Sequence, residues 1–94
     1  MLAVTPIDLS KVNGENIDKE ILRFGIIAEL DAINLYEQLS ENTTDSHIKK
    51  VLLDIAREEK EHVGEFKALL YKLDKEQTEM EDSGAKEVEE LLEE

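Results

Sequence analysis

The stretch AELDAINLYEQLSENTTDSHIKKVLLDIAREEKEH, residues 28–62, holds two helix-forming segments separated by a short polar break. The break is Asn-Thr-Thr-Asp, residues 42–45, and these residue types favour turns and helix caps over helix interiors. Asp45 stands where its carboxylate can accept bonds from the first free N–H groups of a following helix. Because so short a connection makes the flanking helices antiparallel neighbours, this stretch predicts a helical hairpin.

Upstream of the break, residues 16–42 have the pattern of one long helix. No proline interrupts them, and the only proline of the chain, Pro6, lies in residues 1–15, which we expect to form an irregular leader. Apolar residues recur at steps of three and four, which marks one face of a helix: Ile21, Phe24, Ala28, Ala32, Leu35 and Leu39.

Downstream of the break, residues 45–77 predict a second long helix with the same periodicity. Asp82-Ser83-Gly84 then predicts a break, and residues 83–94 predict a short acidic helix with apolar residues on one side. No segment shows the alternation of a strand, so the predicted fold class is all-α: an antiparallel two-helix hairpin plus a short C-terminal helix.

The size and composition of the chain limit what it can be. Its 94 residues predict a single domain, 1–94, and a domain this small needs help from metals, disulfides or partner chains. Disulfides are excluded because there is no cysteine. The net charge of −13 argues against nucleic acid and anionic membranes as partners. No apolar run is long enough for a transmembrane helix and no signal peptide is evident, so we expect a cytoplasmic protein.

Two helices alone cannot surround a core, and the first predicted helix is apolar beyond a single stripe. Its additional apolar residues widen the face that must be covered: Leu22, Ile26, Ile27, Leu30 and Ile33. Both facts predict homodimerisation, in which two hairpins complete a four-helix bundle.

Three polar residues interrupt the apolar stripes. Glu29 has apolar neighbours one and two turns away on both sides, and Glu59 stands in a similar position on the second helix. His62 follows Glu59 by three residues, so the two share a face as a Glu-x-x-His pair. Carboxylates among apolar side chains are costly without a partner, and a metal ion is one such partner. The alternatives are a mispredicted surface residue at position 29 and a solvated charge run at 57–61.

The hairpin register brings these residues together. Positions 29 and 59 are equally far from the middle of the break, roughly 22 Å along each helix, so they should lie at one level. A di-iron carboxylate site uses four carboxylates and two histidines, which is twice what one chain offers. A twofold axis would supply the second set, with one iron per chain. Tyr36, two turns after Glu29, is either a core aromatic or a donor to a ligand carboxylate.

The segments Ala28–Tyr36 and Arg57–His62 resemble those of the encapsulated ferritins, and the likeness covers roughly residues 17–75. The resemblance implies a two-helix hairpin with a short third helix, dimers that close into a decameric ring, and residence inside an encapsulin shell. It implies that Glu29, Glu59 and His62 are the iron ligands and that Tyr36 lies beside them.

The same resemblance implies an activity. The chain would be a ferroxidase that oxidises Fe²⁺ with dioxygen at a di-iron centre between two subunits, for iron storage and detoxification in an encapsulin nanocompartment. At three positions near the family's metal-access point the chain has Ala28, Asp31 and Leu35, so Asp31 is the one acid that can serve there. Both a free cargo protein and a domain of a fusion with the shell protein are compatible with the likeness.

Two other functions fit the residues. A rubrerythrin-like di-iron peroxide reductase would use the same ligands, but its usual second iron centre needs four cysteines, which this chain lacks. A non-enzymatic acidic helical assembly module would hold no stoichiometric iron.

Overall fold

The structure is a computed structural model that describes residues 8–11, 14 and 16–93. Three long helices follow a short 3-10 helix, η1 (Leu9–Lys11): α1 (Ile17–Asn42), α2 (Ser46–Leu73) and α3 (Lys75–Leu92). No strand occurs in these described ranges, so the predicted all-α class is confirmed. Most of the predicted leader, residues 1–7, 12, 13 and 15, lies outside the described residues.

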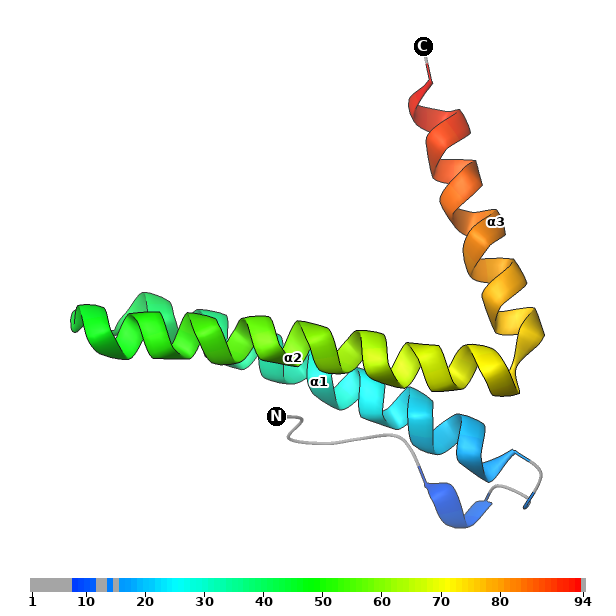
Figure 1. Cartoon of the computed structure of the whole chain (residues 1–94), viewed down its shortest axis with the longest axis horizontal. Helices are drawn as coiled ribbons and strands as arrows, with labels where there is room; N and C mark the ends of the chain where they lie inside the picture. The colour runs from blue at the N-terminus through cyan, green and yellow to red at the C-terminus, as the bar shows by residue number, and fades with distance from the viewer. Residues whose placement is uncertain (1–7, 12–13, 15, 94) are drawn as a thin grey trace.

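Helices α1 and α2 form the predicted antiparallel hairpin, lying side by side along their length (Figure 1). The turn is residues 43–45, and Asp45 caps α2 as expected: one of its carboxylate oxygens accepts bonds from the backbone N–H groups of His47 and Ile48, at 2.8 and 3.0 Å. The cap therefore fixes where α2 begins, and with it the register of the hairpin.

Helix α3 begins earlier than predicted, and this boundary is a correction. We expected α2 to run to residue 77 and a break at Asp82-Ser83-Gly84, but α2 ends at Leu73 and α3 continues through Gly84 in regular helix. The cause is Asp74, which accepts a bond from the backbone N–H of Gln77 and so caps α3. The spacing Asp-x-x-Gln at 74–77 resembles a capping box, a local signal that could have located this bend.

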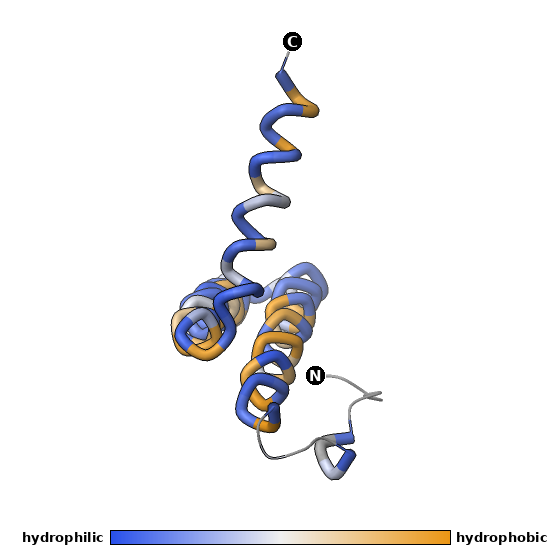
Figure 2. Tube along the Cα trace, turned by 90° about the vertical axis from the view of Figure 1, so that its right-hand side faces the viewer, coloured by the Kyte–Doolittle hydropathy of each residue, from blue (hydrophilic) through white to orange (hydrophobic). Residues whose placement is uncertain are grey.

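Helix α3 points away from the hairpin and packs against α2 only near the bend (Figure 1). It contains no buried residue. In the view of Figure 2 it stands apart from the two hairpin helices, along which hydrophobic and hydrophilic residues alternate around the tube. Among the described residues, no helix is both long enough and apolar enough to cross a membrane.

The core of a single chain is small. Among the described residues, only three apolar residues are buried, Ile33, Ala56 and Leu70, whereas fourteen large apolar residues are exposed. A lone hairpin therefore leaves much of its apolar surface in water, which is the condition that association with a further chain relieves.

Candidate metal centre

The candidate centre is built from the middle of the hairpin. Glu29 comes from α1, and Glu59 and His62 come from successive turns of α2. Near this level the two helices approach closely at Gly25, where an added Cβ atom would lie 3.2 Å from the ring of Phe66. Gly25 is one turn from Glu29 and Phe66 one turn from His62, so close helix packing adjoins the three polar residues.

The structure brings the three side chains together. One ligand atom from each of Glu29, Glu59 and His62 lies within 4.8 Å of the others. Nδ1 of His62 is 3.4 Å from Oε2 of Glu29 and 3.5 Å from Oε2 of Glu59. One imidazole nitrogen thus faces two carboxylates, a mixed donor set that suits iron, zinc and similar ions.

The cluster is half-open. The side chains of Glu29 and Glu59 are 19% and 18% exposed, whereas that of His62 is 44% exposed. The nearby cation Lys60 pairs instead with Glu37, at 3.5 Å on the outside of the hairpin. The two carboxylates are therefore partly withdrawn from water and both face the imidazole, an arrangement that a bound cation would stabilise.

The two further residues singled out from the sequence do not join this cluster. Asp31 is half-buried on α1, and because it follows Glu29 by two residues it lies about 200° further around the helix. Tyr36 is half-buried on the same face as Glu29, two turns closer to the hairpin turn. A role for Asp31 in metal access and for Tyr36 beside the ligands remains a prediction.

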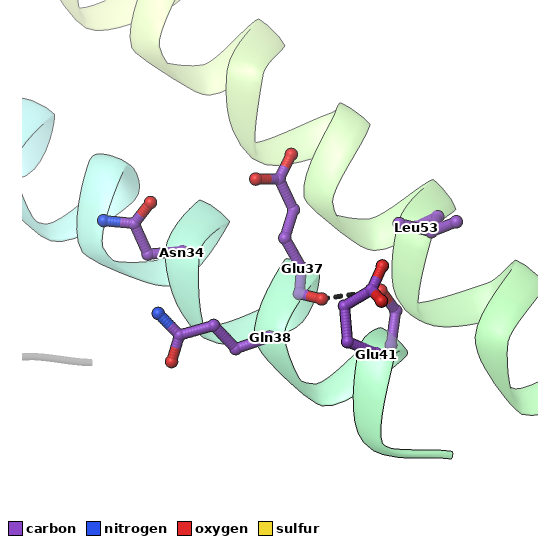
Figure 3. Close-up of a pocket in the computed structure, with 6 residues that line it drawn as sticks. Asn34, Glu37, Gln38, Glu41 and Leu53 are labelled. Carbon is purple, nitrogen blue, oxygen red and sulfur yellow. Dashed lines mark hydrogen bonds between the residues drawn. The ribbon is translucent and has the colours of Figure 1, made fainter. Parts of the chain in front are cut away.

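A separate polar hollow lies nearer the hairpin turn (Figure 3). Glu37, Gln38 and Glu41 of α1 and Leu53 of α2 are among the residues that line it. The hydroxyl of Ser40 donates to the backbone carbonyl of Glu37 at 2.6 Å. None of the three clustered residues lines this hollow. It holds acidic side chains but no histidine, so it lacks the mixed donor set of the centre.

The fold and this cluster together define a class of protein. A helical hairpin that carries Glu on one helix and Glu-x-x-His on the other is the half-bundle of a ferritin-like protein. The profile of the Rubrerythrin family matches residues 20–93, and the chain belongs to this family of ferritin-like proteins.

Within that family, the chain matches encapsulated ferritins. The crystal structure of the encapsulated ferritin domain from Pyrococcus furiosus superimposes with a TM-score of 0.83, at 51% identity over 98% of this chain and 96% of that one. A Ferritin-like-encapsulin shell fusion protein of Pyrococcus furiosus is 53% identical over 97% of this chain. An encapsulin nanocompartment cargo protein, EncC of Myxococcus xanthus, is 43% identical over 60% of it. The matched regions span 27% and 43% of those two relatives.

Proposed function

We propose that this chain is a ferroxidase that oxidises Fe²⁺ at a di-iron centre formed between two copies of residues 1–94, acting as one encapsulated-ferritin-like domain. The observation that carries this proposal is the convergence of Glu29, Glu59 and His62 within 4.8 Å, on two helices of the ferritin-like hairpin. Fe²⁺ is the substrate, and dioxygen accepts the electrons that it releases.

Ligand number and charge support a shared centre. One chain supplies two carboxylates and one imidazole, which is half of the di-iron carboxylate set. Two chains supply four carboxylates, whose four negative charges balance two Fe²⁺ ions. A neutral assembly is the one that a water-poor helical bundle tolerates best. One iron per chain is the expected content of the centre.

The surface of the hairpin supports pairing with a second copy. His62 remains partly exposed and large apolar residues on both hairpin helices are exposed as well. A second hairpin that packed against the exposed apolar side chains beside the cluster would bury them and complete a four-helix bundle. Closure of such dimers into a decameric ring follows from the likeness to encapsulated ferritins and needs its own measurement.

The protein's part in the chemistry is to hold and shield the metal. Glu29, Glu59 and His62 would hold the iron, and in a dimer Glu59 and its symmetry mate would supply the shared carboxylates. Carboxylate donors favour the ferric product because they neutralise its additional charge. The electron transfer itself belongs to iron and dioxygen.

The names of the relatives point to a compartment. One relative is a fusion with an encapsulin shell and another is an encapsulin nanocompartment cargo protein. We extend this association to the present chain, and propose that it oxidises iron for storage and detoxification inside an encapsulin shell in the cytoplasm.

The decisive experiment compares ligand variants with matched controls. Because loss of even an outer partner of a metal ligand costs about 10- to 100-fold, Glu59→Ala and His62→Ala should each slow aerobic Fe²⁺ oxidation at least about tenfold. Glu58→Ala and His47→Ala remove the same residue types from exposed positions and should leave the rate unchanged. A normal rate in either ligand variant would remove the centre proposed here.

A peroxide reductase remains a second candidate, because the matching family is Rubrerythrin. Its ligands would be the same, but electrons would have to come from outside residues 1–94, since these contain no cysteine for a four-cysteine iron centre. Comparing how fast the ferrous protein reacts with hydrogen peroxide and with dioxygen distinguishes the two functions.

A further inference from the structure

The bend between α2 and α3 is a single residue, Asp74, which makes three hydrogen bonds. Its backbone N–H donates to the carbonyl of Leu70 at 2.8 Å, which closes α2. One carboxylate oxygen accepts from the backbone N–H of Gln77 at 3.0 Å, which opens α3. The other accepts from the guanidinium of Arg23 at 2.6 Å, so α1 is tied to the bend as well. The side chain of Asp74 is only 12% exposed.

A second carboxylate spans the bend seven residues later. Glu81 of α3 accepts from the hydroxyl of Tyr71 at 2.7 Å through one oxygen, and from the side-chain amide of Gln77 at 2.8 Å through the other. The ammonium of Lys67 lies 3.7 Å from the first oxygen. Tyr71 and Lys67 belong to the last turns of α2, so Glu81 joins the two helices directly across the bend.

Apolar burial does not explain the direction of α3. The helix has no buried residue, and its large apolar side chains, Met80, Val88, Leu91 and Leu92, are all more than half exposed. What holds α3 to the hairpin is therefore polar. We propose that Asp74 and Glu81, with their donors Arg23, Gln77, Tyr71 and Lys67, form a polar clamp that presets the direction of α3 within one chain, before it contacts any other molecule.

The protonation behaviour of the clamp agrees with this geometry. The pKa of Glu81 is lowered from its ordinary 4.5, first by the bond from Tyr71, then by that from Gln77 and by Lys67. The pKa of Tyr71 is raised from 10.0, first by its bond to Glu81, then by burial and by the charges of Glu81 and Asp82. Because the pKa of Glu81 is lowered on folding, this carboxylate stabilises the fold at pH values above 4.5. Because the pKa of Tyr71 is raised, its hydroxyl stabilises the fold at pH values below 10.0. The clamp should therefore stay closed throughout that window.

The pKa of Asp74 points the same way. It is lowered from 3.8, first by the bond from the Gln77 backbone N–H and then by the charges of Lys19 and Arg23. Its contribution to stability is thus present above 3.8 and is lost as the pH falls through the lowered value. Both carboxylates of the clamp are charged wherever the protein is studied near neutral pH.

The clamp can be tested by distances within one chain. The protein has no cysteine, so spin labels attached through Lys50→Cys on α2 and Lys86→Cys on α3, both exposed positions, are unique. The full chain is labelled, diluted into a large excess of unlabelled chain and measured without metal by pulsed electron spin resonance. A preset α3 gives a narrow distance distribution.

Glu81→Ala should broaden this distribution. A hydrogen bond to a charged group commonly changes a conformational equilibrium constant about tenfold or more. The population of chains with label distances outside the original range should therefore rise about tenfold in Glu81→Ala. Tyr71→Phe removes only the hydroxyl that donates to Glu81 and nearly conserves the side-chain volume, so this population should rise less. The matched control is Glu79→Ala, which makes the same substitution at an exposed site two residues away and should change nothing.

Two results would overturn the proposal. One is a broad distribution in the unsubstituted chain, which means that α3 has no preset direction. The other is a distribution for Glu81→Ala that matches that of Glu79→Ala. Circular dichroism measures the helix content of each variant and so identifies one that has lost its fold. If Glu81→Ala is unfolded, the distance distribution of Tyr71→Phe is compared with that of Glu79→Ala instead. No outcome depends on bound iron, so the clamp and the ferroxidase proposal stand or fall separately.

Discussion

Replacing Gly25 by alanine tests the close helix contact that adjoins the candidate centre. An alanine Cβ would lie 3.2–3.3 Å from three ring atoms of Phe66, whereas ordinary contact begins at 3.4 Å. The ring or the helix must therefore yield by a few tenths of an ångström. Because Gly25 and Phe66 are each one turn from a proposed ligand, the yielding would occur beside the cluster.

Two effects of known size oppose each other at this site. Removing glycine from a helix interior stabilises a protein by about 0.5–1 kcal/mol, and overpacking a close contact costs about 1–3 kcal/mol. Gly64→Ala provides the first effect alone, because nothing lies within 4 Å of its added Cβ. Gly64 follows His62 by two residues and so faces away from the cluster. The free energies of unfolding of the two variants should differ by about 1–3 kcal/mol, with Gly25→Ala the less stable.

The measurement is thermal unfolding of metal-free protein, followed by circular dichroism at one chain concentration, since association alone shifts the midpoint. For a domain of this size each kcal/mol corresponds to about 4–8 °C. Titration with Co²⁺ should show weaker binding to Gly25→Ala than to Gly64→Ala. If Gly25→Ala is as stable as Gly64→Ala and binds Co²⁺ equally well, the contact does not constrain the hairpin as argued.

Four further predictions concern metal, assembly and protonation. Metal analysis of loaded dimer should give one tightly held iron per chain, and a monomer that holds two would contradict the shared centre. Metal-free protein should be the least associated state and Fe²⁺ or Zn²⁺ should promote assembly, as sedimentation under anaerobic conditions can show, because a ligand that binds only the dimer stabilises it. The double variant Glu29→Gln, Glu59→Gln removes the converging charges, so it should associate without metal and respond little to it. Absorbance titration should find a tyrosine that ionises above pH 10.0, which returns toward the ordinary value in Glu81→Ala because Tyr71 loses its acceptor.

The hairpin could be predicted from the sequence because its signals are local and repeated. The polar break at 42–45 and the cap Asp45 set the turn, and the spacing of positions 29 and 59 about that turn set the register. The structure places Glu29, Glu59 and His62 together as the register argument required.

The bend at Asp74 was misplaced for an equally physical reason. An acidic segment contains few apolar residues to mark where its helix begins, and Asp82-Ser83-Gly84 has the residue types of a stronger break. The actual bend begins at the local cap Asp74, but its direction is held by Arg23, fifty-one residues earlier, and by a contact between Tyr71 and Glu81 across two helices. Periodicity within one window cannot report such a distant partner.

The short turn at residues 43–45 also has a consequence for how the chain folds. Contacts between α1 and α2 join residues whose separation in sequence increases steadily with distance from the turn. The hairpin can therefore form progressively outward from the turn, without first closing a large loop. Pulse-labelled hydrogen exchange should find amides beside the turn protected before those near Ile17 and Leu73. Each newly synthesised chain would thus hold its own three ligands early. The slow step toward an active centre would then be the encounter of two chains, whose rate rises with their concentration.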